Sequence, residues 1–163
     1  MSEAAQLHRV LPKPEDTRQL GYDVADLLRP GDLVLLVGPL GAGKTVFAQG
    51  VGDGLGVAGQ VTSPTFVIAR VHRPDPARGG RIPLVHVDAY RLGTVAEVDD
   101  LDLDADTEDS VTLVEWGGGL VEQLTDSWLE VRLDRAEDDV RTATLTGHGG
   151  DWPSRLARVP SIR

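Results

Sequence analysis

Eight consecutive residues, from Gly38 to Thr45, have the types needed to hold a phosphate chain. They match the pattern G-x-x-x-x-G-K-[ST] without a gap. Glycines let the main chain curl so that successive N–H groups point at phosphate oxygens. A lysine then reaches the β- and γ-phosphates, and a threonine hydroxyl is a magnesium ligand. The sequence therefore predicts a loop that binds ATP as its magnesium complex.

The predicted nucleotide contacts are shared along this loop. Pro39 has no N–H, so the phosphate cradle must be built from the later residues. The lysine also neutralises charge on the transferring phosphate as a point cation, which makes it a catalytic group. We assign nucleotide contacts to Gly38, Leu40, Gly41, Ala42, Gly43, Lys44 and Thr45, and a metal contact to Thr45.

Two carboxylates stand at the ends of apolar runs. The run 84–87 ends at Asp88, and the run 111–114 ends at Glu115. A phosphate-loop enzyme needs a carboxylate at the end of a nearby buried strand, to hold magnesium directly or through water. Two such acids suggest that one binds the metal while the other orients or activates water. The residues alone leave open which acid does which, and a capping or surface role remains an alternative for each.

Two further positions could serve the same site, whereas a nearby histidine is assigned to the core. The turn 62–66 carries hydroxyls that could contact the γ-phosphate, although an ordinary turn explains it equally. Trp116 could shield the site or stack on a ligand, or it could pack in the core. His86 lies within an expected strand, where we predict a core histidine rather than a catalytic one.

The elements around these residues indicate an α/β fold. The apolar run Leu33–Val37 predicts a strand buried on both faces, directly before the loop, and a helix over 44–52 follows it. Apolar spacing predicts another helix over 14–28. Further strands are expected at 65–71, 82–87, 111–114, 128–133 and 140–145, with a long-tipped hairpin at 73–81, a helix at 151–158 and a loose lead-in at 1–13. We predict one phosphate-loop domain over 1–163, with a mixed sheet flanked by helices.

Composition narrows the function classes. The formal net charge of −10 repels phosphate backbones, so we do not expect the chain alone to grip nucleic acid. The absence of cysteine excludes disulfides and thiolate metal sites. No apolar run approaches the ~18 residues needed to span a bilayer. We predict a cytoplasmic protein with no membrane partner.

The loop alone does not define a reaction, because ATPases, GTPases and kinases share it. The chain contains no asparagine, so an Asn-Lys-x-Asp base-reading motif cannot exist, and a Leu-Ser-Gly-Gly-Gln signature is absent as well. A small-molecule kinase remains an alternative, with a lid made of Arg70, Arg73, Arg78 and Arg81. A third hypothesis is a nucleotide-binding regulator that hardly hydrolyses ATP.

The motifs in this order resemble the bacterial TsaE family, the ATPases of threonylcarbamoyladenosine biosynthesis on tRNA. The resemblance rests on the loop 38–45, the segments 61–66 and 86–92, and Val114-Glu115-Trp116. The loop is unspecific by itself. The Ser-Pro-Thr-Phe, Asp-x-Tyr-Arg-Leu and Glu-Trp set that follows is specific.

The resemblance implies a role for each matching residue. Thr45 and Glu115 would hold Mg²⁺, and Asp88 would be needed for ATP hydrolysis. Ser63 to Thr65 would form a switch segment, with Thr65 among the catalytic groups, and Trp116 would lie at the edge of the site. The partner would be a TsaB–TsaD complex, with tRNA reached only indirectly. The acidic segment 99–109 could face a basic surface of that partner.

Overall fold

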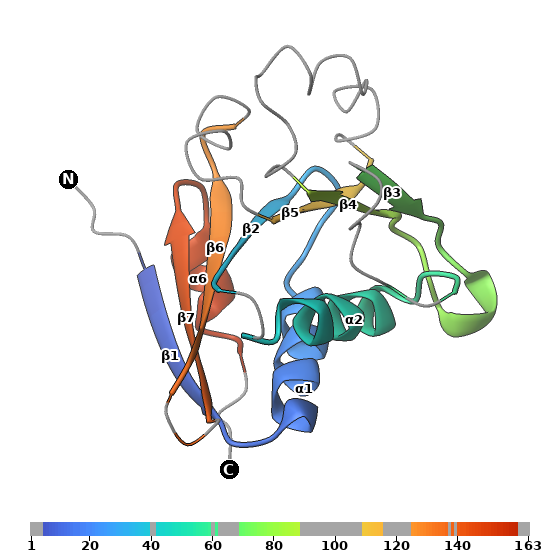
Figure 1. Cartoon of the computed structure of the whole chain (residues 1–163). Coiled ribbons are helices and arrows are strands. Elements are labelled where there is room, and N and C mark those ends of the chain that lie inside the picture. Colours follow the sequence, from blue (N-terminus) through green and yellow to red (C-terminus); the bar gives the residue numbers. More distant parts are fainter. Residues whose placement is uncertain are drawn as a thin grey trace.

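The computed structural model describes residues 5–39, 42–59, 61, 69–88, 109–115, 125–136, 138 and 140–159 (Figure 1). Its strands are β1 (Ala5–Leu11), β2 (Leu33–Val37), β3 (Ala69–His72), β4 (Leu84–Asp88), β5 (Val111–Glu115), β6 (Trp128–Arg135) and β7 (Arg141–His148). Its helices are α1 (Pro14–Ala25), α2 (Lys44–Leu55), the 3-10 helix η1 (Pro76–Arg78) and α6 (Trp152–Leu156).

The strands form one mixed sheet in the order β1-β7-β6-β2-β5-β4-β3. The four central strands are parallel, since β2 pairs in parallel with both β5 and β6, and β5 pairs in parallel with β4. The pairs β6–β7, β7–β1 and β3–β4 are antiparallel. The predicted α/β class with a mixed sheet is confirmed. The parallel centre brings the carboxyl ends of β2, β4, β5 and β6 to one edge of the sheet.

Of the described helices, α1, α2 and α6 lie on one face of this sheet (Figure 1). Alternate strand residues point to the same face, so Val34 and Leu36 of β2 join Leu113 of β5 and Val131 of β6 in one apolar cluster. Phe47 of α2 belongs to the same cluster. The strand residues that point to the opposite face, such as Leu35, are buried as well. Burial on both faces explains why β2 is a continuous apolar run, whereas β6 alternates buried apolar residues with charged ones on its more exposed face.

Glycines let α1 and α2 approach closely. A Cβ added to Gly50 of α2 would lie 2.0 Å from the carbonyl oxygen of Arg18, and one added to Gly21 of α1 would lie 2.2 Å from that of Phe47. Real Cβ atoms do not come this close, so the two backbones meet where only glycine fits. This contact fixes α2, and with it the phosphate loop, against α1.

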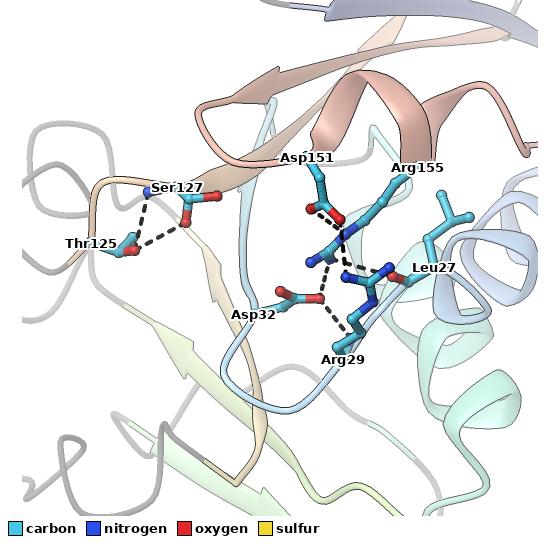
Figure 2. A network of polar contacts seen from close by, with 7 residues as sticks. All are labelled: Leu27, Arg29, Asp32, Thr125, Ser127, Asp151 and Arg155. Carbon is cyan, nitrogen blue, oxygen red and sulfur yellow. Dashed lines mark hydrogen bonds and ion pairs between the residues drawn. The ribbon is translucent and has the colours of Figure 1, made fainter.

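Helix α6 is joined to the segment before β2 by a buried guanidinium (Figure 2). Arg155 donates to Asp32 at 2.5 Å and to Asp151 at 2.9 Å, and it lies 4.4 Å over the ring of Trp152. Arg29 binds the other carboxylate oxygen of Asp151 at 3.0 Å. The cluster holds the last described helix against the region where α1 passes into β2.

The predicted loose lead-in over residues 1–13 is wrong from residue 5 onward. Ala5–Leu11 is a strand that pairs with β7 along its whole length, and the side chain of Leu11 is buried. Its sequence lacks a clean alternation, because Val10 is 59% exposed beside the buried Leu11. Pairing with β7, which lies far along the chain, is what makes this segment a strand.

Other boundaries shift by a few residues. Helix α1 ends at Ala25 rather than residue 28, and α2 continues to Leu55, where Gly56 takes the left-handed conformation with φ 72° and ends it. None of the helices among the described residues has the length and apolar character needed to cross a membrane.

Candidate functional site

The phosphate loop begins where β2 ends, at Gly38. This residue has φ +152°, and a Cβ there would lie 2.3 Å from the carbonyl oxygen of Leu133 on β6. Only glycine fits between the two backbones, so the chain can leave the sheet directly above the neighbouring strand. The pattern glycine is therefore required by packing as well as by phosphate approach.

The loop ends at Gly43, which is the N-cap of α2. Its φ of +101° belongs to the left-handed region, and its carbonyl oxygen accepts the first helical hydrogen bond, from Phe47 N at 2.9 Å. No side chain caps this helix end. The free N–H groups and the positive end of the helix dipole therefore face the loop, which is the arrangement that binds anions.

Lys44 lies in the first turn of α2, and its side chain folds back over the loop. The residue is only 7% exposed, and its Nζ donates a hydrogen bond to the carbonyl oxygen of Gly38 at 2.8 Å. The ammonium is thereby held between the two ends of the loop. A buried cation at a helix N-terminus favours an anionic ligand at this point.

The two predicted acids end neighbouring strands at the same level. In the register, Glu115 of β5 pairs with Asp88 of β4 on one side and with Leu36 of β2 on the other. Leu36 is two residues before Gly38, so Glu115 lies close to the start of the phosphate loop. The sheet thus brings both acids next to the loop, as the strand ends predict, although the Asp88 side chain lies outside the described part.

The Glu115 carboxylate is buried and hydrogen-bonded to a histidine. His86 Nε2 lies 3.0 Å from Glu115 Oε2, and the two side chains are 0% and 7% exposed. From the sequence, His86 is predicted to be a core residue. That is correct for its burial but misses its partner, because the partner is on a different strand. The signal was its position two residues before a strand-end acid, which places it on the face of the sheet that carries Glu115.

A pocket of about 80 Å³ adjoins the loop at Gly43. It lies between the start of α1, the first turn of α2 and the start of β7, and it is lined by Leu11, Pro12, Lys13, Pro14, Thr17, Gly43, Val46 and Arg141. Its walls are mostly apolar, with cationic side chains at Lys13 and Arg141. No local pattern in the sequence indicates this pocket, because its lining comes from three distant segments of the chain.

These groups fit a magnesium–nucleotide complex. Within the part of the chain that the structure describes, no three His, Cys, Asp or Glu residues gather into a metal cluster. Mg²⁺ does not need one, because it keeps several waters and is bound by one or two protein oxygens together with substrate phosphates. The Thr45 hydroxyl and the Glu115 carboxylate are oxygen donors of that kind.

Several predicted positions lie outside the described residues. These are Leu40 and Gly41 of the loop, Thr65 and Ser63 of the predicted switch segment, Trp116, and residues 99–108 of the acidic segment. Their predicted roles stay predictions. Gly38 is described at the end of β2, and Ala42, Gly43, Lys44 and Thr45 are described at the start of α2.

The arginine-lid alternative meets an obstacle at Arg78. Its guanidinium donates to the carbonyl oxygen of Val57 at 2.5 Å and to Asp53 at 3.2 Å. Asp53 also pairs with Arg18 of α1 at 2.6 Å. These contacts are at the carboxyl end of α2, the end opposite to the phosphate loop. Arg78 therefore holds the β3–β4 connection onto α2 instead of facing the phosphates.

The sheet order, the glycine-lined loop and the uncapped helix behind it define a phosphate-loop α/β protein. A family model described as threonylcarbamoyl adenosine biosynthesis protein TsaE matches residues 11–143. The chain belongs to the TsaE family, which confirms the resemblance noted in the sequence.

Individual relatives agree with this assignment. The TsaE protein of Streptomyces coelicolor is 59% identical over 140 residues, which cover 83% of this chain and 93% of the relative. That of Bacillus subtilis is 40% identical over 140 residues, covering 85% of this chain and 84% of the relative. Both are called tRNA threonylcarbamoyladenosine biosynthesis protein TsaE. The crystal structure of YdiB from Bacillus subtilis superposes with a TM-score of 0.78 at 31% identity, over 98% of this chain and 97% of that one.

Proposed function

We propose that this protein is an ATPase of tRNA threonylcarbamoyladenosine biosynthesis, which binds Mg-ATP and drives a TsaB–TsaD complex through its cycle. One observation carries the ATP part: the buried Lys44 ammonium and the free N-terminus of α2 converge on a loop that starts beside Glu115. Family membership supports the tRNA part, since the relatives are named for that biosynthesis.

The loop residues bind the phosphates. Main-chain N–H groups from Ala42 to Thr45 would donate to the β-phosphate, and Lys44 would exchange its bond to Gly38 for the β- and γ-phosphate oxygens. Because this lysine is already buried, little side-chain entropy is lost when the phosphates arrive. The Lys44 side chain therefore needs little further ordering to bind the phosphates.

The metal would be held by Thr45 and Glu115. When bound, Mg²⁺ bridges phosphate oxygens and neutralises charge that develops on them. Glu115 supplies a carboxylate at the end of β5, and Thr45 supplies its hydroxyl from the first turn of α2. Asp88, paired with Glu115 in the register, would orient or activate the attacking water.

The nucleoside would extend into the pocket beside Gly43 and Val46. In a phosphate loop the phosphates nearer the nucleoside follow the first turn of the helix, and Val46 is in that turn. Pro12 and Pro14 offer flat apolar walls for a base, and Arg141 offers a cation that can lie against an aromatic ring. Thr65 and Trp116 would complete the site from the γ-phosphate side.

The partner and the compartment complete the proposal. The net charge of −10 disfavours direct binding to tRNA, so the chain would act through TsaB and TsaD, in the cytoplasm. ATP hydrolysis here would reset that complex, while the acyl transfer itself would take place on the partner.

Threonylcarbamoyl transfer to tRNA over many turnovers tests this function. The matching TsaB, TsaD and TsaC-type proteins would be combined with the unmutated chain, its Lys44→Ala variant, its Asp88→Ala variant, or buffer. We expect sustained modification only with the unmutated chain, accompanied by ATP consumption. Equal modification in all four reactions would refute the role. Full modification with Asp88→Ala but not with Lys44→Ala would favour a regulator that works by binding ATP without hydrolysing it.

A further inference from the structure

The buried pair of His86 and Glu115 crosses two neighbouring strands. His86 of β4 is in register with Leu113 of β5, and Glu115 is two residues further along β5. Side chains two residues apart on a strand share a face, so the imidazole and the carboxylate lie on the same side of the sheet. Their bond, 3.0 Å from Nε2 to Oε2, runs diagonally toward the phosphate-loop edge.

A buried histidine at this apolar position is expected to make a hydrogen bond. Its neighbours on β4 are Leu84, Val85 and Val87, and each is at most 1% exposed. An apolar side chain would fill the position without burying two ring nitrogens, whose desolvation is unfavourable unless they are hydrogen-bonded. Among the described residues, Nδ1 has no hydrogen-bond partner, which leaves the bond to Glu115 as the polar contact of this ring.

The direction of that bond follows from the acceptor. A carboxylate that binds a metal is ionised and can only accept, so in the metal-bound state Nε2 would carry the hydrogen and donate the hydrogen bond to Oε2. The contact fixes the rotation of the carboxylate and leaves Oε1 to act as a ligand. Residues that bind metals are commonly held by such a second hydrogen bond, and loss of the outer partner typically weakens metal affinity 10- to 100-fold.

We propose that His86 is a positioning residue, which holds the Glu115 carboxylate in the orientation that binds the magnesium of the nucleotide complex. This inference rests on the proposed function, because it deepens the role of the same site. It gives His86 an effect on metal affinity that a packing role would not produce.

Two amide substitutions separate these roles. The Nε2 of glutamine lies as many bonds from Cα as the Nε2 of histidine, so His86→Gln keeps a donor at the reach of Glu115. His86→Asn places its amide nitrogen at the shorter reach of Nδ1 and loses the contact. Leu84→Val, at a buried position on the same strand and face, is the control for general loosening of the core.

The readout is the binding of a fluorescent, non-hydrolysable ATP analogue in EDTA and over a range of Mg²⁺ concentrations. With His86→Asn, we expect the Mg²⁺ concentration for half-maximal tightening to rise roughly 10- to 100-fold, while the affinity in EDTA stays unchanged. His86→Gln should restore the unmutated Mg²⁺ dependence, and Leu84→Val should keep it. Glu115→Gln should lose the Mg²⁺ effect and serves as the reference for a missing ligand.

Each contrary result has a distinct meaning. An unchanged Mg²⁺ dependence in His86→Asn, with binding intact, overturns the role of His86 and leaves the ATP site standing. An equal loss of affinity in EDTA and Mg²⁺ for both amide variants overturns it as well, since that pattern belongs to packing. Failure of the unmutated chain to bind the analogue at all would refute the proposed function itself.

Discussion

The Nζ of Lys44 donates a hydrogen bond to the main-chain carbonyl oxygen of Gly38 at 2.8 Å, so the last turn of the phosphate loop is bonded to its first residue. The two residues are six positions apart in the chain, so the bond links the two ends of the loop. A buried ammonium needs acceptors, and a carbonyl oxygen stabilises it less than a phosphate does. The Lys44 ammonium is therefore preorganised to receive phosphate oxygens.

Replacing Lys44 by methionine tests this preorganisation. Methionine keeps much of the apolar stem but removes the cation, so we expect ATP affinity to fall roughly 10- to 100-fold, which corresponds to the 1.5–3 kcal/mol typical of hydrogen bonds to charged groups. Titration calorimetry would measure it. Arg158→Met is the control: it removes an exposed cation just after α6, far along the chain from the loop, and should leave the ATP affinity unchanged. Equal affinity in Lys44→Met would contradict the assigned role.

Placing alanine at Gly50 tests the close contact of α1 with α2. Alanine favours helix over glycine by up to about 1 kcal/mol, yet its Cβ would lie 2.0 Å from the carbonyl oxygen of Arg18. Overpacking of this kind typically costs 1–3 kcal/mol, so we expect a net loss of unfolding free energy in urea titrations. Gln49→Ala, at the preceding half-buried position, should cause little change. A higher unfolding free energy for Gly50→Ala would contradict this prediction, because it would show that α1 and α2 can move apart to make room for the Cβ.

Removing the Arg78 side chain tests whether it belongs to a lid. Arg78→Ala loses the bond to the carbonyl oxygen of the buried Val57 and the ion pair with Asp53. Both side chains of the ion pair are partly exposed, so we expect its loss to cost about 1 kcal/mol of stability at most. ATP turnover in the presence of the partner proteins should stay within twofold of the unmutated rate, a margin of about 0.4 kcal/mol. A large fall in turnover with unchanged stability would revive the kinase alternative.

Acid should weaken the attachment of α6 through Asp151. Burial acts to raise the pKa of this carboxyl, but the positive charges of Arg155 and Arg29 outweigh it and hold the pKa below the ordinary value of 3.8 (Figure 2). Because the pKa is lowered in the folded state, the carboxylate contributes stability above pH 3.8, and this contribution is lost as the pH falls through the folded pKa.

Urea unfolding between pH 6 and pH 2 would measure this contribution. Asp151→Asn should lower stability at neutral pH and make the decline in acid less steep than in the unmutated chain. Asp26→Asn, at an exposed position after α1, should keep the unmutated slope. The same slope in Asp151→Asn would show that its ion pairs do not contribute to stability.

The sequence by itself determined the phosphate loop, the strand before it, the helix after it and the family. These features are local: a run of apolar residues, glycines at fixed spacing and a lysine in one helical turn need no distant partner to be recognised. The two strand-end acids were also predictable, because an acid that follows an apolar run marks the carboxyl end of a buried strand.

Only the tertiary structure decided which distant residues meet. The register of β4 with β5 put His86 against Glu115, and pairing with β7 made a strand of residues 5–11. The pocket beside Gly43 and the bond from Arg78 to Val57 likewise join segments far apart in the chain. Such contacts depend on strand order and helix packing, which arise from the burial of the whole apolar face and are not encoded in any short stretch of residues.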